Sequence, residues 1–149
     1  VWEKIEKFDL IYKDSKFQLF KNKTAMDHVS LFYNYRVIKD KEEILKTFYD
    51  KNFDFRNTLI LEENPNMENI NNISKKGTAK IVSYSPNKII IRTNTENPSL
   101  LFLSDNFYPK WEAKVNGIKT KIYRSDYSFR SVVVPKGQSE VEFTYGGIL

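Results

Sequence analysis

The chain has 149 residues, of which 40% are hydrophobic and 15% aromatic, enough for one ordinary packed domain or two small ones. Its net charge of +5 comes from 24 Lys and Arg, mostly Lys, interspersed with 19 Asp and Glu, and without a basic stripe we expect no nucleic-acid partner. The absence of cysteine excludes disulfides, a thiol nucleophile and a thiolate metal site, and no window approaches the roughly 20 apolar residues that cross a bilayer.

Residues 1–70 predict a small α/β part. Short runs rich in aromatic and branched residues, separated by polar turns, are typical of strands. The predicted strands of this part are 8–12, 17–20, 29–35 and 58–63.

One helix interrupts these strands. Asp40, followed three residues later by Glu43, resembles a capping box and predicts a helix that ends near residue 50. Ile44, Leu45 and Phe48 then mark one apolar face of that helix.

A stretch rich in Asn, with one Pro and one Gly, follows the helical part, and we place a linker at residues 71–77. From residue 78 the chain reads as successive strands with turn signals between them and no helical pattern. The strands are TAKIVSY, KIIIRTN, SLLFLSD, WEAKV, IKTKIY, FRSVVV and EVEFTY. Such spacing predicts a mainly β chain, with an antiparallel β-sandwich of the jelly-roll or carbohydrate-module kind over residues 78–149.

The dipeptide Asn116-Gly117 predicts a two-residue type I′ hairpin, because both residues tolerate a positive φ. Counting back gives the opposed pairs Val115–Ile118, Ala113–Thr120 and Trp111–Ile122. We therefore expect Trp111 to point into the core.

The segment FRSVVV-PKGQS-EVEFTY predicts a second hairpin. Its last strand alternates Val141, Phe143 and Tyr145 with polar residues, so its apolar side should join the same core.

Catalytic and metal-binding motifs are scarce. His28 has neither a Cys nor an HExxH partner, which favours a surface or strand-edge histidine over a metal ligand. The sequence has no Gly-rich phosphate loop and no G-x-S-x-G nucleophile elbow. We expect no catalytic residue, no metal and no cofactor in this chain.

Asp105 and Asp126 are the one carboxylate pair that the predicted topology brings to the same end of the sheet, as a glycosidase would need. Arg124 and Arg130 are close to them in the sequence pattern, however, and an arginine lowers the pKa of a neighbouring carboxyl group, which is wrong for a catalytic acid. We expect Asp105 to pair with an arginine.

Sugar binding without catalysis fits the same region better. Exposed aromatic rings stack on sugar rings, while Asp, Asn and Arg side chains bind hydroxyl groups. The candidate ligand-binding residues are Asp105, Asn106, Tyr108, Arg124, Asp126 and Tyr127. Aromatic residues at strand ends also serve as lids on a sandwich core, and the sequence leaves both interpretations open.

The order of the motifs in residues 78–145 resembles the carboxyl-terminal extracytoplasmic region of YfhO-type bacterial membrane proteins. The matching elements are Ser104-Asp105, Tyr108-Pro109-Lys110-Trp111, Asn116-Gly117, Arg124 to Phe129, Val134-Pro135-Lys136-Gly137 and Val141 to Tyr145. Two departures stand out: Asp27-His28 replaces a Pro-Arg usual in the family, and Lys110 replaces a Gly.

The resemblance implies a part of a multi-spanning protein related to the glycosyltransferase-C superfamily, whose members use lipid-linked sugars, some of them to decorate cell-wall polymers. It implies a place on the extracytoplasmic side of the bacterial membrane, with the membrane portion of the parent protein as a partner. It implies no catalytic residue within this chain.

Our leading hypothesis is a non-catalytic extracytoplasmic accessory domain that positions a glycan or an anionic wall polymer, or braces the membrane part. Because the sequence starts on Val1, we also expect it to be a soluble piece of a longer protein. Two alternatives stay open, an independent carbohydrate-binding β-sandwich protein and a hydrolase that uses Asp105 and Asp126.

Overall fold

The structure is a computed structural model that describes residues 5–71 and 73–146, and it consists mainly of β-strands. In chain order the elements are β1 (Phe8–Lys13), β2 (Gln18–Asn22), β3 (Val29–Phe32), β4 (Asn34–Val37), α1 (Lys41–Tyr49), β5 (Thr58–Leu61), β6 (Thr78–Ser85), β7 (Lys88–Thr95), β8 (Ser99–Leu103), β9 (Trp111–Val115), β10 (Ile118–Thr120), β11 (Tyr123–Ser125), β12 (Phe129–Val134) and β13 (Gly137–Tyr145).

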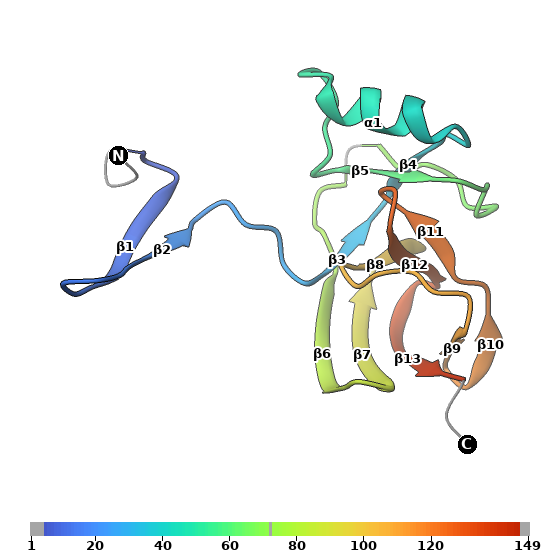
Figure 1. The fold of residues 1–149 in the computed structure, drawn as a ribbon. Coiled ribbons are helices and arrows are strands. Elements are labelled where there is room, and N and C mark those ends of the chain that lie inside the picture. Colours follow the sequence, from blue (N-terminus) through green and yellow to red (C-terminus); the bar gives the residue numbers. More distant parts are fainter. Residues whose placement is uncertain (1–4, 72, 147–149) are drawn as a thin grey trace.

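Two sheets face each other and confirm the predicted mainly β, sandwich-like fold (Figure 1). One sheet has the order β10-β9-β13-β7-β6 and the other the order β3-β8-β12-β11-β5-β4. The six-stranded sheet combines β3, β4 and β5, which precede the predicted linker, with β8, β11 and β12, which follow it. The linker itself leads to β6, the edge strand of the five-stranded sheet.

The main core lies between the two sheets. The six-stranded sheet contributes Leu31, Leu101, Leu103, Val132 and Val134, and the five-stranded sheet contributes Ile89, Ile91, Ala113, Val115, Val141 and Phe143. A second core covers the other face of the six-stranded sheet, with Phe32, Leu59, Leu61, Leu100 and Phe102 among its members. Strand β8 is therefore buried on both faces, which explains its uninterrupted apolar run.

The segment predicted as one strand at 29–35 is bent into two, β3 and β4, with Tyr33 between them. Strands β3 and β4 are the two edge strands of the six-stranded sheet, although they follow each other directly in the chain. The sheet therefore curls around the second core, and its two edges come together at Tyr33. Tyr33 fixes the bend: its hydroxyl group lies 2.8 Å from Thr95 Oγ1 and accepts a 2.8 Å hydrogen bond from the Gly77 N–H.

Helix α1 covers the outer side of β5. The Asp40 side chain accepts a 2.8 Å hydrogen bond from the Glu43 N–H, as the predicted cap requires. Ile44 is fully buried against Ile60 and Phe53, whereas Leu45 is 42% exposed, so the prediction that Leu45 shares the apolar face is wrong.

The β9–β10 hairpin has the predicted register, with Val115 opposite Ile118 and positive φ at Asn116 and Gly117. Strand β10 ends at Thr120, so the predicted Trp111–Ile122 pair does not form in the sheet. Trp111 instead pairs with Tyr145 of β13 and packs against the main core, as its inward position requires.

The predicted second hairpin is a crossing between sheets. Strand β12 lies in the six-stranded sheet, and β13 lies at the centre of the five-stranded sheet between β7 and β9. Pro135 and Lys136 connect them. The predicted alternation of β13 is nonetheless correct, because Val141 and Phe143 are fully buried.

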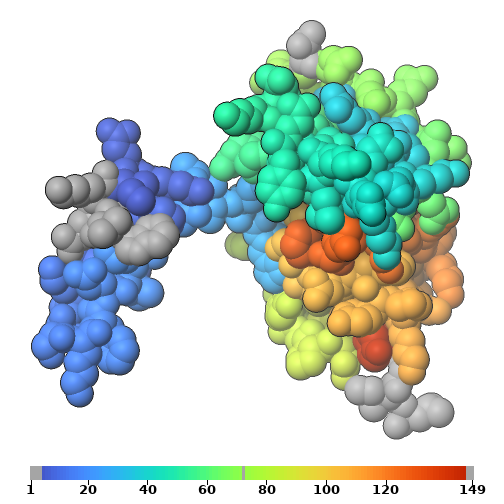
Figure 2. Space-filling view, turned by 45° about the horizontal axis from the view of Figure 1, so that its top comes forward, coloured from blue at the N-terminus to red at the C-terminus, as the bar shows by residue number. Residues whose placement is uncertain are grey.

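Strands β1 and β2 form a separate two-stranded sheet, which we call the hairpin arm (residues 8–22). Figures 1 and 2 show it standing away from the sandwich, joined through an extended segment that leads into β3. The predicted strands 8–12 and 17–20 are both present, and they pair with each other in an antiparallel register that is irregular at Ile11.

Gly77 permits the close approach of the two sheets beside Tyr33. A Cβ atom there would collide with the Asn94 carbonyl oxygen and would lie 2.8 Å from Thr95 Cβ and 2.9 Å from Leu31 Cδ1. We expect Gly77→Ala to lower the free energy of unfolding by about 1–3 kcal/mol, measured by urea denaturation. In the control Gly146→Ala the nearest neighbour is 3.5 Å from the new Cβ, and the change should stay within about 0.5 kcal/mol. Equal effects of both substitutions would contradict the steric argument.

Candidate functional site

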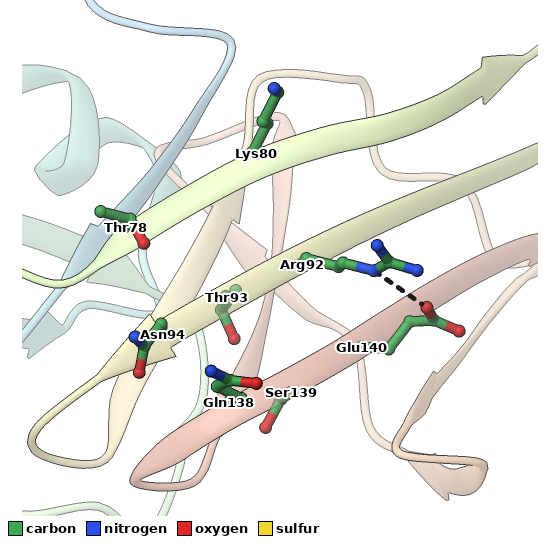
Figure 3. A pocket seen from close by; sticks show the side chains of 8 residues that line it. All are labelled: Thr78, Lys80, Arg92, Thr93, Asn94, Gln138, Ser139 and Glu140. Carbon is green, nitrogen blue, oxygen red and sulfur yellow. Dashed lines mark hydrogen bonds and ion pairs between the residues drawn. The ribbon is translucent and has the colours of Figure 1, made fainter.

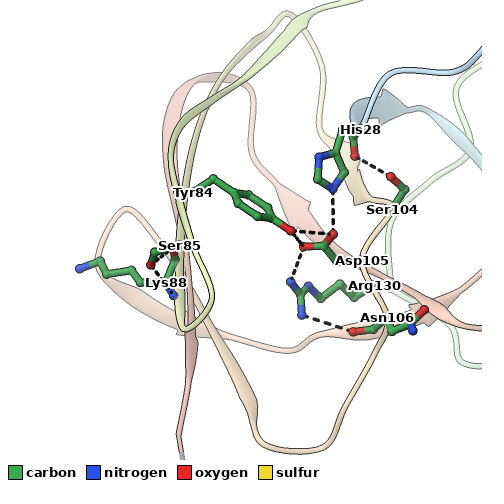
Figure 4. A network of polar contacts seen from close by, with 8 residues as sticks. All are labelled: His28, Tyr84, Ser85, Lys88, Ser104, Asp105, Asn106 and Arg130. Carbon is green, nitrogen blue, oxygen red and sulfur yellow. Dashed lines mark hydrogen bonds and ion pairs between the residues drawn. The ribbon is translucent and has the colours of Figure 1, made fainter. Parts of the chain in front are cut away.

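Asp105 lies at the centre of a polar cluster at the end of β8 (Figure 4). Its carboxylate accepts hydrogen bonds from Arg130 Nη2 at 2.9 Å, from His28 Nε2 at 2.8 Å and from the Tyr84 hydroxyl group at 3.2 Å. The four residues come from β12, the segment before β3, β6 and the segment after β8. The predicted pairing of Asp105 with an arginine is present, and the arginine is Arg130.

Arg130 is a buried cation, 1% exposed. Its guanidinium carbon lies 3.9 Å from the ring centre of Trp111 and 5.2 Å from that of Phe143. Burial lowers the pKa of Arg130 below its ordinary value, and the negative charge of Asp105 opposes this shift only in part. Asp105 supplies the counter-charge that the aromatic rings around the guanidinium group cannot provide. Contact with a desolvated aromatic ring stabilises such a cation by about 2 kcal/mol.

The cluster attaches residues 23–28, which join the hairpin arm to β3 and which we call the root of the arm, to the sandwich. Beside its side-chain contact with Asp105, His28 offers its carbonyl oxygen to the Ser104 N–H at 3.0 Å and to the Ser104 hydroxyl group at 3.2 Å. His28 is thus a strand-edge histidine, as predicted, with a structural partner that the sequence did not suggest.

Arg124 occupies a different environment. Its guanidinium carbon lies 4.9 Å from the ring centre of Phe107, and its Nε lies 3.8 Å from Glu62 Oε1. Phe107 in turn donates its N–H to the Ser128 carbonyl oxygen at 2.7 Å, which joins the segment after β8 to the β11–β12 turn.

Asp126 starts that turn with φ of 46°, and Tyr127 follows with φ of 74°. The Asp126 carboxylate accepts a 2.9 Å hydrogen bond from the Ile60 N–H, and its own N–H donates to the Ile60 carbonyl oxygen at 2.9 Å. Burial raises the pKa of Asp126 to about 6, although the hydrogen bond from Ile60 opposes this. These two hydrogen bonds attach the β11–β12 turn to β5.

The six predicted ligand-binding residues therefore divide into two groups. Asp105, Arg124 and Asp126 bind internal partners, whereas Asn106, Tyr108 and Tyr127 are exposed. Asp105 and Asp126 bind different internal partners, an arrangement that gives the hydrolase alternative no support. Tyr108 is 56% exposed, Tyr127 is 39% exposed and Asn106 is exposed as well, so a ligand can reach these three side chains.

A hollow of about 400 Å³ lies elsewhere, on the outer face of the five-stranded sheet (Figure 3). Two rows of polar side chains cross β6, β7 and β13 there, as the strand register requires. The rows are Thr78–Asn94–Gln138 and Lys80–Arg92–Glu140. Arg92 and Glu140 contact each other at 3.4 Å and are largely exposed.

Sequence reasoning did not find this hollow. The alternation of KIIIRTN and GQSEVEFTY does place Arg92, Asn94, Gln138 and Glu140 outward, and that was the available signal. The sequence did not reveal that β13 lies beside β7, because the segment before β13 resembled a hairpin turn that would pair β13 with β12.

Comparison with known proteins places the chain in a family. The model of the family described as "Bacterial membrane protein YfhO" matches residues 3–147. The chain is 27% identical over 94 residues to "Uncharacterized protein YfhO" of Bacillus subtilis (strain 168), a region that covers 62% of this chain and 11% of that relative. No solved structure matches. Within the described residues, no helix has the length and apolar character needed to span a bilayer.

Removing the charge of Asp105 should leave Arg130 buried without a counter-ion. We expect Asp105→Asn to reduce the free energy of unfolding by roughly 3 kcal/mol in urea titrations. Glu140→Gln removes one partner of the exposed Arg92 pair and serves as the control, with an expected change below about 0.5 kcal/mol. A cost for Asp105→Asn no larger than that of the control would show that the buried pair is not what holds this corner.

Neutralising Asp126 should change how stability depends on pH. The raised pKa means that the folded state favours the protonated carboxyl group, so its contribution is present below about pH 4 and is lost as the pH rises through about 6. Asn accepts the same hydrogen bond from Ile60 and tolerates positive φ. The stability gain of Asp126→Asn should therefore grow by about 2–3 kcal/mol between pH 3.5 and pH 7.5, since a displaced pKa is worth about 1.4 kcal/mol per pH unit.

The pH series of urea titrations should include Asp126→Ala, which loses the acceptor for the Ile60 N–H and should be less stable than Asp126→Asn at every pH. A gain of Asp126→Asn that is the same at pH 3.5 and pH 7.5 would exclude burial of the charge as its cause.

Proposed function

The chain belongs to the YfhO family of bacterial membrane proteins, and we propose that it serves such a protein as a non-catalytic accessory domain on the extracytoplasmic side. Its role there is to position a glycan or a cell-wall polymer acceptor for the membrane portion of the parent protein, a portion related to the glycosyltransferase-C superfamily. A bracing contact with that membrane portion accompanies this role.

The two polar rows on the outer face of the five-stranded sheet carry the proposal. The residues that line one hollow of about 400 Å³ carry three hydroxyl groups, two amides and three charged groups, and this volume is typical of sites for small ligands. Amide groups both donate and accept hydrogen bonds, which suits the hydroxyl groups of a sugar. The rows run across the strands, so a chain of sugar units lying across β6, β7 and β13 meets both.

The charges of the hollow favour an anionic polymer over a neutral one. Lys80 and Arg92 face the hollow, and Glu140 is the one acidic side chain that opposes them there. Anionic repeat units of a wall polymer would bind Lys80 directly and compete with Glu140 for Arg92.

A second candidate surface is the pair of loops that carries Tyr108 and Tyr127. The hydrogen bond from Phe107 to Ser128 holds these loops side by side, and both tyrosine rings are accessible, at 56% and 39% exposure. Accessible rings on joined loops favour the alternative of a carbohydrate-binding β-sandwich protein that stacks sugar rings without the charged hollow.

Titration of the chain with an anionic wall polymer and with neutral oligosaccharides, followed by calorimetry, tests the proposal. We expect the double substitution Asn94→Ala with Gln138→Ala to weaken binding by roughly tenfold, since two hydrogen bonds of about 0.5–1.5 kcal/mol each are lost. Asn52→Ala, an exposed amide in the turn after α1, is the matched control and should bind as the unmodified chain does.

The substitution Tyr127→Ala distinguishes binding at the tyrosine loops from binding in the hollow. Loss of binding in Tyr127→Ala, with normal binding in the Asn94 and Gln138 variant, would reject the hollow and support the tyrosine loops. Absence of binding to every polymer and oligosaccharide tested would overturn the positioning role.

A further inference from the structure

The hairpin arm exposes several large apolar side chains, as an element does that another surface covers. Its two strands pair only with each other in the described part of the chain, and Figure 2 shows the arm apart from the sandwich. An isolated two-stranded hairpin is only marginally stable in water, so an arm of this kind requires further contacts.

Each face of the arm carries an apolar pair beside polar residues. Leu10 lies opposite Phe20 on one face, and Tyr12 lies opposite Leu19 on the other. Leu10, Tyr12 and Leu19 are 41%, 53% and 55% exposed, and Phe17 beside the turn is 69% exposed. A hairpin lying on a membrane surface needs only one apolar face, whereas strands that carry apolar residues on both faces are typical of burial between two protein layers.

The direction of the arm is fixed at its root. His28 is held by Asp105 and Ser104, and the Thr24 carbonyl oxygen accepts a 2.6 Å hydrogen bond from Arg56 Nη2. The segment that joins the arm to β3 is thus tied to the sandwich at two places, and a partner that binds the arm is also placed relative to the sandwich.

The source of that partner follows from the length of the relatives. The matched region is 11% of the Bacillus subtilis relative, so most of a family member lies outside the region that this chain represents. We propose that the arm is a docking element for another extramembrane segment of the same polypeptide, outside residues 1–149. This segment adds a strand to an edge of β1 or β2, beside which no further strand lies among the described residues, and covers the apolar side chains of both faces.

This inference rests on the family membership and not on the glycan-positioning role. Its occupant is a protein segment with alternating apolar residues, since a strand edge offers main-chain hydrogen bonds and the apolar pairs of the two faces offer apolar contacts. A second copy of the chain and a lipid surface are the competing occupants, and the experiment below separates them.

Cysteine accessibility tests the proposal, because these 149 residues contain no cysteine. Leu10→Cys and Leu19→Cys each report one face of the arm, and Ile118→Cys, at a position 74% exposed on β10, is the control. Each is introduced into the full-length protein, with its other cysteines replaced, and into the 149-residue chain. The rate of maleimide labelling is then measured in membranes and in detergent.

In the full-length protein we expect both arm positions to be labelled at least about tenfold more slowly than the control, in membranes and in detergent alike. In the 149-residue chain all three positions should be labelled at rates within about threefold of one another.

Three results would overturn the proposal. Arm positions labelled as fast as the control in the full-length protein would show that nothing covers the arm. Protection of the arm already in the 149-residue chain, together with a dimer in solution, would identify a second copy as the occupant. Protection that disappears in detergent, or that affects only one face, would identify lipid. Labelling requires no glycan, so failure of the polymer titration leaves this test unaffected.

Discussion

The buried guanidinium group of Arg130 is the constraint on which the rest of this structure depends. A cation that is 1% exposed must have an anion beside it, and Asp105 is that anion. The rings of Trp111 and Phe143 enclose the other side of the group. The segment after β8 combines carboxylate and aromatic residues in the manner of a sugar site, yet its Asp105 serves as the counter-ion of a buried cation, while Tyr108 stays exposed.

Local patterns in the sequence predicted the elements of the fold well, and the reason is physical. The Asn116-Gly117 turn determines its own register through backbone conformation, and the Asp40 cap and the alternation of β13 depend on neighbours within a few residues. The bend at Tyr33 depends instead on contacts with Gly77 and Thr95, distant in sequence, and no local signal distinguishes it from a continuous strand.

The same distinction explains the candidate sites. Asp105 was correctly expected to meet an arginine, but the choice of Arg130 depends on the pairing of β12 with β8, which sets Arg130 opposite Leu103, two residues before Asp105. The polar rows of the outer face likewise depend on β13 lying beside β7. The alternation of polar and apolar residues showed which side chains of β13 point outward. It did not show which strand lies beside β13, because Pro135 and Lys136 carry the chain from one sheet to the other where a hairpin was expected.

The Asp105 carboxylate links the stability of the core to the placement of the hairpin arm. One of its oxygen atoms accepts from Arg130 and the other from His28, so the same group neutralises the buried cation and holds the root of the arm. A contact that displaced His28 would remove only one of these partners, and the pair with Arg130 would persist in the core. The arm can therefore engage another segment without exposing the buried charge, while any change at Asp105 itself affects the sandwich and the arm together.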